Sequence, residues 1–441
     1  MKIPAPVQAG QNRNVLQLER ITLPEWTAFL LVLWPFLDAL ISSIPRMTSH
    51  VKFLADAVIL CAVLLYVLRG KIAFPRKILP LVLCVGTFFC YTLIVYLIQY
   101  ESILFYFWGL RNNFRFYAAF FIFIGAFREQ SVKVLFRLLD VVFWINFALS
   151  LFQFVILGVG GDFLGGIFGI GGGFNGYTNI FLFVMVGKSF LRVFNNEESL
   201  YRCVIQCGAS LLIAAMAEMK FFYVMFAAIL VWALLVTGFT WKKFFLFFLG
   251  GIGLILSAEL LVSWFGFENF LSLEKIIGKA TRRHYATGKD VNRLSAIPIL
   301  AKSVVTNPLD QIFGLGLGNC DSSSIAALNS PFFRRYEYLH YNWFGAPMMF
   351  IETGYIGLFM YLSFFVLCFI HAYKQMHLGK GNPMYCQLAM IVAVISCILV
   401  FYDVSMRSDA AYLMYFSMAL PFIKRETAGA PHKQTGGDAT L

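Results

Sequence analysis

Residues 244–264 read FFLFFLGGIGLILSAELLVSW, an apolar run in which Glu259 is the one charged side chain. A helix needs about 20 such residues to cross the hydrocarbon core of a bilayer. This run therefore predicts a membrane span. A long polar segment, residues 266–345, follows it, and another apolar run begins at 346. A polar segment between two spans must lie on one side of the membrane, and we expect the functional residues there.

The whole chain has the composition of a membrane protein. Of its 441 residues, 60% are hydrophobic and 13% are charged, whereas charged residues make up about a quarter of soluble domains. The apolar runs are continuous rather than alternating, which favours helices over a barrel. We therefore predict an all-α integral membrane protein with about twelve transmembrane helices. Their predicted ranges are 26–44, 52–68, 78–98, 104–126, 135–157, 179–194, 201–217, 221–238, 244–264, 346–370, 385–402 and 410–424.

Basic residues in the short loops predict the orientation, because Lys and Arg are retained in the cytoplasm during insertion. One set of loops and both ends of the chain carry most of them: Lys2, Arg13, Arg20, Arg69, Lys71, Arg76, Lys77, Arg128, Lys133, Arg137, Lys188, Arg192, Arg202, Lys242, Lys243, Lys374, Lys380, Lys424, Arg425 and Lys433. The opposite short loops hold few, such as Arg46, Lys52, Lys220 and Arg407. Both termini are therefore expected in the cytoplasm and segment 266–345 outside. The net charge of +12 reflects this topology, and no motif supports a nucleic-acid partner.

The chain is expected to form one membrane domain, residues 26–424, without a convincing internal repeat. A cytoplasmic segment, 1–25, precedes it, and a disordered cytoplasmic tail, 425–441, follows. No cleavable signal pattern is expected, because residues 1–25 are polar and the first apolar run is long enough to remain a helix. Cys320 is the one cysteine of the outward loop, so the cysteines are best interpreted as packing residues.

Two outward segments contain many glycines. Residues 158–178 lack the strand and soluble helix that a phosphate-binding fingerprint requires, so a flexible or re-entrant segment is favoured over a phosphate cradle. In the larger loop, residues 291–305 have the apolar spacing of a helix, which would carry Arg293 near its beginning and end at Pro308. Gly314, Gly316 and Gly318 then require unusual backbone freedom or close approach of another segment.

Three outward residues are candidates for chemistry. The guanidinium of Arg293 can bind phosphate oxygens in pairs, although it could also contact lipid headgroups or Asp290. Lys220 interrupts an apolar stretch, where it serves either the hairpin turn or an anion, and pairing with Glu218 would weaken its role as an anion ligand. His340 can take a proton from a hydroxyl near neutral pH, or it is a polar anchor at the interface. Metal coordination is not expected, because neither His284 nor a cysteine lies at ligand spacing from His340.

Charged residues also occur within the apolar runs, where they are costly. Arg111 and Arg115 lie one helical turn apart, so either they line an internal anionic site or Arg111 extends to the surface. Asp38, Asp56 and Asp140 either pair with these cations or form a proton path.

The order of these features resembles the superfamily of O-antigen polymerases and O-antigen ligases, membrane glycosyltransferases that act on undecaprenyl-diphosphate-linked glycans. The resemblance covers the twelve-helix plan and the large outward loop between helices nine and ten. The loop motif that carries it consists of Arg293, Asn307-Pro308-Leu, the Gly-x-Gly stretch, His340 with Asn342, and Glu352-x-Gly354-x-x-Gly357. Ala217-Glu-Met-Lys220-Phe corresponds to an outward turn where members usually carry Ser-Arg.

The resemblance implies a GT-C-like, metal-independent inverting glycosyltransferase of the bacterial inner membrane that uses no cofactor. Lys220 and Arg293 would bind the donor diphosphate, and His340 would be the base. Arg111, Arg115, Asn342 and Glu352 are the expected substrate-binding residues. The partners would be lipid-linked donor and acceptor glycans, membrane lipid and a chain-length regulator protein.

A polymerase of O-antigen, capsule or exopolysaccharide repeat units is the favoured function. A ligase that transfers the glycan to lipid A core is the first alternative. The second, from a different class, is a flippase or transporter for lipid-linked saccharide with a cationic cavity formed by Arg111 and Arg115.

Overall fold

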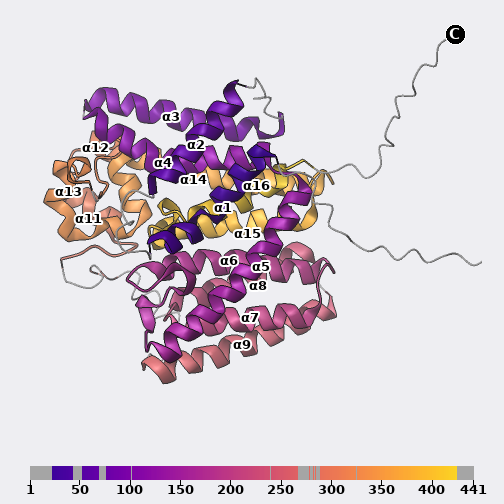
Figure 1. The fold of residues 1–441 in the computed structure, drawn as a ribbon. Helices are drawn as coiled ribbons and strands as arrows, with labels where there is room; N and C mark the ends of the chain where they lie inside the picture. Colours follow the sequence, from indigo (N-terminus) through magenta and orange to yellow (C-terminus); the bar gives the residue numbers. More distant parts are fainter. Residues whose placement is uncertain are drawn as a thin grey trace, which may run out of the picture.

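The computed structural model describes residues 22–42, 52–68, 76–100, 102–238, 240–266, 278, 282, 284, 289–323 and 325–424. Within these residues the chain is all-α, and its long helices run side by side in one bundle (Figure 1). The predicted tail 425–441 and most of segment 1–25 lie outside the described residues.

Each of the twelve predicted apolar runs coincides with a helix. These helices are α1 (Leu23–Ser42), α2 (Lys52–Leu68), α3 (Leu79–Gln99), α4 (Ile103–Ala126), α5 (Glu129–Leu151), α6 (Phe174–Phe194), α7 (Leu200–Met216), α8 (Lys220–Thr237), α9 (Trp241–Phe265), α14 (Gly345–His377), α15 (Pro383–Tyr402) and α16 (Ala411–Ala419). Within the described residues, eight helices are long and apolar enough to cross a membrane. The chain is therefore an all-α membrane protein.

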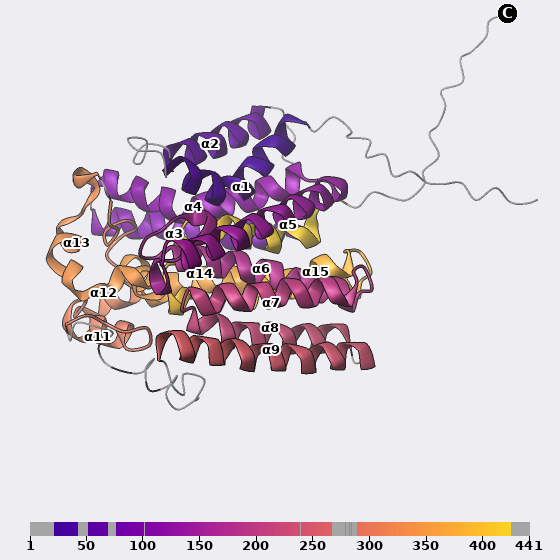
Figure 2. The same cartoon turned by 60° about the horizontal axis from the view of Figure 1, so that its bottom comes forward.

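The bundle has a buried centre and an apolar periphery. Helix α6 is almost fully buried, and it packs against α7, α8 and α15. Helices α2 and α9 lie on opposite sides of the bundle (Figure 2). Helices α3 and α9 bury little of their length and expose large apolar side chains such as Leu97 and Phe248. An apolar exterior of this kind suits contact with lipid tails rather than water.

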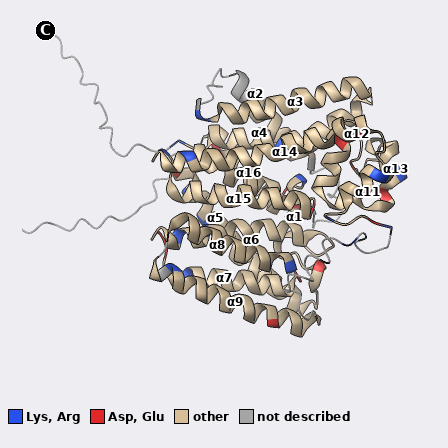
Figure 3. Cartoon of the chain, turned by 180° about the vertical axis from the view of Figure 1, so that it is seen from behind, with Lys and Arg blue, Asp and Glu red and all other residues tan. Residues whose placement is uncertain are grey.

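The two ends of the bundle differ. At one end the Glu25 carboxylate accepts hydrogen bonds from Arg128 and Ser131. The backbone of Arg128 forms an isolated β-bridge with that of Lys424. Several Lys and Arg residues lie at this end, and a smaller group lies beside α13 at the other (Figure 3). That other end carries the short helices α11 (Ala296–Ser303), α12 (Pro308–Phe313) and α13 (Pro331–Tyr336). Residues 289–343, as far as the structure describes them, thus form a compact cap on one end of the bundle.

Helix α14 breaks where the cap meets the bundle. Gly354 has φ 64° and ψ −170°, which interrupts the helix after Glu352. The glycine loop, residues 314–321, uses this break, because the amides of Leu315 and Gly316 donate to the carbonyls of Ile351 and Glu352. The loop thereby satisfies carbonyl groups that the interrupted helix leaves without partners.

Gly314 and Gly318 of this loop are required by close approach, and Gly316 by its backbone conformation, as predicted. A Cβ on Gly318 would lie 1.9 Å from the carbonyl oxygen of Phe105 in α4, and one on Gly354 would lie 2.2 Å from that of Ile312. Gly314, Gly316 and Gly318 all have positive φ. Only glycine allows the loop, α4 and α14 to come this close.

One local prediction was wrong. The predicted helix 291–305 is shorter: α11 begins at Ala296, and Arg293 lies in the preceding turn. Pro298 explains the late start, because proline fits only the first turn of a helix. Segment 158–178, which was predicted to be flexible or re-entrant, is held by side chains of α5 and the residues after it. The side chain of Gln153 hydrogen-bonds both the amide and the carbonyl of Gly166, and Asn146 Oδ1 accepts from the amide of Ile167.

We predict that Gly354→Ala destabilises the protein by at least about 1–3 kcal/mol, because an L-residue is strained at this φ and its Cβ would collide with α12. The measurement is the midpoint of heat-induced loss of monodisperse protein in detergent. Gly86→Ala in α3 is the control, because no atom lies within 4 Å of the added Cβ. Equal midpoints for the two variants would contradict this account of the break.

Candidate functional site

Lys220 lies at the beginning of α8, directly after a tight turn. Glu218 has φ 55° in this turn, and its carbonyl accepts a hydrogen bond from the amide of Lys220. The Lys220 ammonium lies 2.8 Å from Glu218 Oε1. The pairing that the sequence suggested is therefore present. Both side chains are partly exposed, so the pair can exchange partners with a ligand in water.

Arg293 is held by α15 and the start of α14. Its Nε donates to the carbonyl of Tyr402 at 3.1 Å, and its guanidinium lies 4.3 Å from the centre of the Tyr402 ring. The ring of Phe344 lies on it at 5.6 Å. The Tyr402 ring in turn stacks on Phe221, with centroids 3.6 Å apart. Because Phe221 follows Lys220, two stacked rings connect the elements that carry the two cations.

Carboxylates complete this cluster. The pKa of Asp162 is raised by partial burial and by the charge of Glu218. The positive charges of Lys220 and Arg293 oppose this rise only in part. Burial raises the pKa of Asp403 to about 6, although hydrogen bonds from Ser405 and the charge of Arg293 oppose the shift. We call Lys220, Arg293, Asp162, Glu218 and Asp403 the outer cluster.

His340 and Asn342 lie in the turn that leads into α14. His340 has φ 51°, and its ring stacks on Trp343 with centroids 4.3 Å apart. The amide of Val291 donates to the carbonyl of Leu339, which brings this turn beside the segment that carries Arg293. The structure thus brings the three predicted catalytic residues, Lys220, Arg293 and His340, to neighbouring turns at the capped end of the bundle.

Arg111 and Arg115 are engaged inside the protein. Arg111 Nε lies 2.8 Å from Asp56, and Arg115 Nη1 lies 2.7 Å from Asp409. Arg115 and Asp409 are buried. The predicted pairing of Asp56 with these cations is confirmed, so both charges already have partners. As substrate ligands, Arg111 and Arg115 would have to give up these ion pairs.

The other two acids within apolar runs are placed differently. Asp140 pairs with Lys188 and Arg192 rather than with the cations of α4. Asp38 is buried in α1.

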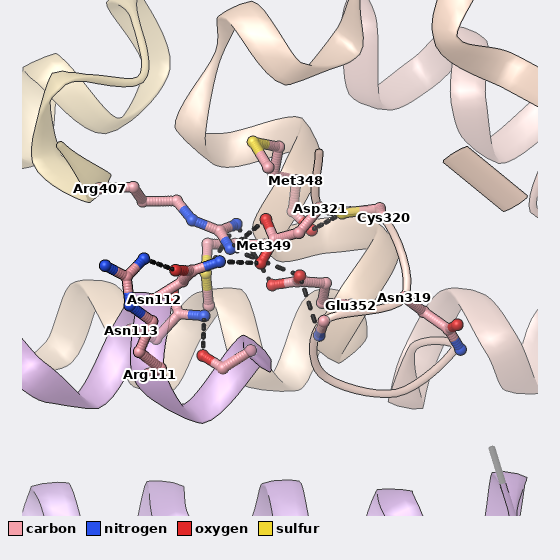
Figure 4. A network of polar contacts seen from close by, with 12 residues as sticks. Arg111, Asn112, Asn113, Asn319, Cys320, Asp321, Met348, Met349, Glu352 and Arg407 are labelled. Atoms are coloured by element: carbon pink, nitrogen blue, oxygen red, sulfur yellow. Dashed lines mark hydrogen bonds and ion pairs between the residues drawn. The ribbon is translucent and has the colours of Figure 1, made fainter. Parts of the chain in front are cut away.

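Glu352 belongs to a second cluster, which Figure 4 shows. Arg407, in the short helix η8 (Ser405–Arg407), lies 2.7 Å from Asp321 Oδ1 and 3.2 Å from Glu352 Oε2. Glu352 Oε1 also accepts from the amide of Gly318, and Asp321 Oδ2 accepts from Asn112. We call these residues, Arg407, Asp321, Glu352, Asn112 and Gly318, the Arg407 network. Glu352 is fully buried within it, so it contacts protein rather than an open surface.

Cys320, Asp321 and Glu352 bring three ligand atoms within 4.8 Å of one another, as a metal site would. The guanidinium of Arg407, however, already lies against both carboxylates. Burial raises the pKa of the Cys320 thiol well above its usual value, and a protonated thiol is a poor metal ligand. Arg407 therefore supplies the cation that these carboxylates require.

The sequence argument missed the central role of Arg407, which it counted among the outward loop charges. A signal was present, because Arg407 lies between Asp403 and Asp409 in a short polar turn that joins two apolar runs. Three charges in so short a turn beside membrane helices are costly unless they are used.

Comparison of the chain with family models found no match, and no curated protein is similar to it in sequence. The function is therefore argued from the residues and the geometry described above.

We predict that Asp409→Ala destabilises the protein by about 3–5 kcal/mol, because it leaves the buried Arg115 without its nearest counter-charge. Heat-induced aggregation in detergent measures this change. Lys133→Ala is the control, since it removes an exposed pair with Glu129 that is worth about 0.3–0.5 kcal/mol. The double variant Arg115→Met with Asp409→Leu should recover most of the loss. If Asp409→Ala is no more harmful than Lys133→Ala, the buried pair is not a stability determinant.

Proposed function

We propose that this chain is a metal-independent inverting glycosyltransferase of the bacterial inner membrane, which polymerises undecaprenyl-diphosphate-linked oligosaccharide repeat units. One observation carries the proposal. Arg293 lies over the Tyr402 ring, which stacks on Phe221, the residue after Lys220, and the turn of His340 is hydrogen-bonded to the segment that carries Arg293. In the proposed topology twelve helices cross the membrane, both termini are cytoplasmic and the capped end faces the periplasm.

The chemistry is a displacement at the anomeric carbon of the donor. The acceptor hydroxyl forms the new glycosidic bond while the bond to the phosphate oxygen breaks, and the lipid diphosphate leaves with the bonding electrons. Negative charge therefore grows on the diphosphate in the transition state. Cations that are already fixed in place stabilise that charge more than the ground state. We assign this role to Arg293, which Tyr402 holds in place, whereas Lys220 mainly binds the donor diphosphate.

His340 is the proposed base, which takes the proton of the acceptor hydroxyl as the new bond forms. Attack from the face opposite the leaving diphosphate inverts the anomeric centre. The imidazole lies at the edge of the cap, stacked on the partly exposed Trp343. An indole at this position suits a sugar acceptor, because apolar sugar faces pack on aromatic rings.

The carboxylates of the outer cluster would repel the donor diphosphate, so one of them must give up its cation when the donor binds. In the structure Glu218 holds the Lys220 ammonium. A diphosphate carries more negative charge and more acceptor oxygens than one carboxylate, so it competes effectively for the same ammonium. We therefore propose that donor binding replaces Glu218 at Lys220.

The transporter alternative requires a cationic cavity lined by Arg111 and Arg115. Both side chains are instead paired with acids, which favours the transferase. A ligase differs from a polymerase only in its acceptor. Loss of a polymerase leaves single repeat units on the cell surface, whereas loss of a ligase leaves lipid-linked chains untransferred.

We predict that Arg293→Ala and His340→Ala lower polymer formation by about 10²–10⁴-fold, the usual range for a lost electrostatic stabiliser or general base. Lys220→Ala should be strongly impaired, and Lys220→Arg should be tolerated or mildly impaired because the charge is retained. The assay incubates purified protein with a defined undecaprenyl-diphosphate oligosaccharide and separates the products by size.

Arg334→Ala is the matched control for these variants. Arg334 is an exposed arginine of α13 at the same end of the molecule, and its loss should leave the rate within about twofold, as expected for an exposed charge. A normal chain-length ladder from the His340→Ala protein would refute the base assignment. Equal losses in the Arg334→Ala and Arg293→Ala proteins would refute a specific role for Arg293.

A further inference from the structure

The turn between α15 and α16, residues 402–409, contacts both clusters. On one side the carbonyl of Tyr402 accepts from Arg293, and the carbonyl of Asp403 accepts from Gly345 at the start of α14. On the other side Arg407 reaches Asp321 and Glu352. The turn thus joins the segment that carries the proposed diphosphate ligand to the glycine loop.

The turn is internally braced. The amide of Ser405 donates to Asp403 Oδ1, and the amide of Arg407 donates to the carbonyl of Val404. From outside, Arg115 Nη2 donates to the carbonyl of Arg407 and Nη1 pairs with Asp409. Because the turn is short and hydrogen-bonded, we expect a displacement of Arg407 to move Tyr402 at its other end.

Arg407 joins two separate parts of the chain. Asp321 ends the glycine loop, and Glu352 lies in α14 just before the break, so the guanidinium bridges carboxylates from two segments (Figure 4). The side chains are 5%, 4% and 0% exposed. A planar guanidinium can bind two carboxylates at once, whereas the ammonium of lysine is a single point charge. Burial alone would lower the pKa of Arg407. The charges of Asp321 and Glu352 outweigh this effect and raise the pKa above its usual value, so the side chain remains charged.

The glycine loop is attached to several parts of the chain, and the attachment through Glu352 is the one that Arg407 contacts directly. At Gly318 it meets α4 through backbone atoms, where Gly109 leaves no side chain to pack. Its amides donate to α14, and one of these hydrogen bonds, from Gly318, ends on Glu352 Oε1. Side chains of other segments also hold the loop: Gln99 donates to the carbonyl of Gly314, Ser330 to that of Asn319 and Tyr341 to that of Cys320. Glu352 therefore fixes the part of the loop around Gly318, and the guanidinium of Arg407 contacts Glu352 and the neighbouring Asp321 directly.

We propose that Arg407 is a positioning residue that clamps the glycine loop onto the broken helix α14 and, through the turn 402–409, holds Arg293 in place for the diphosphate. The second half of this proposal rests on the proposed glycosyltransferase function. Without Arg407, two buried carboxylates lose their counter-charge and must draw in water or protons. The loop should then detach, and Tyr402 should no longer hold Arg293 in one orientation.

Cys320 reports on the clamp without any assay of activity. Its side chain is fully buried beside Asp321, where the thiol contacts the carbonyl of Met348. The experiment treats the purified, folded protein with a maleimide and follows labelling of Cys320 by peptide mass spectrometry. Cys368, which is fully buried in α14, is the internal control, because its protection shows that the bundle is intact.

We expect Cys320 to be protected in the unchanged protein and to be labelled at least about tenfold faster in Arg407→Gln, with Arg407→Lys between them because it keeps the charge but not the fork. Cys368 should stay protected in all three proteins. Should Arg407→Gln fail to fold, Arg407→Lys provides the same comparison. Protection of Cys320 equal to that of the unchanged protein in a folded Arg407 variant would overturn the clamp.

The same proteins test the effect on Arg293. We expect Arg407→Lys to lower kcat for polymer formation at least about tenfold. A shift of the Arg293 guanidinium by about 1 Å is enough to reduce the rate of the chemical step by this factor. The KM for the lipid-linked donor should change less than about threefold. Rates are normalised to the protein in which Cys368 is protected, so a mere loss of folded enzyme does not count. An unchanged kcat together with an exposed Cys320 would refute the link to Arg293. A failure of the unchanged protein to make polymer would refute the proposed function, while the labelling result would still decide the clamp.

Discussion

A single arginine in an apolar surrounding constrains the capped end of this molecule. Arg407 is buried with two carboxylates, and such a group is tolerated only when its charge and its donors are satisfied. Asp321 and Glu352 supply the charge, and each is itself hydrogen-bonded by Asn112 or Gly318. The break in α14, the glycine loop and the turn 402–409 meet at these contacts.

The same constraint explains why the loop is built from glycine. Backbone groups of the loop must find partners, because residues 314–321 are mostly buried. The amides of Leu315 and Gly316 take the carbonyls that the break at Gly354 exposes. Side chains at Gly314 or Gly318 would prevent that approach, since the nearest backbone atoms would lie within 2.4 Å of an added Cβ. The glycine loop therefore packs as a buried segment against α4 and α14.

Sequence predicted the helices well and the contacts between them poorly. Apolar length is a local signal, so all twelve runs appear as helices. The partner of Arg293 is different, because Tyr402 lies 109 residues away, and Asp321 lies 86 residues from Arg407. No spacing rule connects such positions. The beginning of α11 was a local error, since Pro298 marks the first helical turn and could have been used.

The two cations of the outer cluster differ in how firmly they are held, and this difference separates their roles. Arg293 is fixed by the carbonyl and ring of Tyr402, so it needs no rearrangement when charge develops on the leaving group, and preorganised groups lower the barrier most. Lys220 is a flexible point charge that must first leave Glu218. Its interaction energy is therefore spent largely on binding the donor. By this argument, loss of Arg293 should lower kcat, whereas loss of Lys220 should mainly raise the KM for the lipid diphosphate.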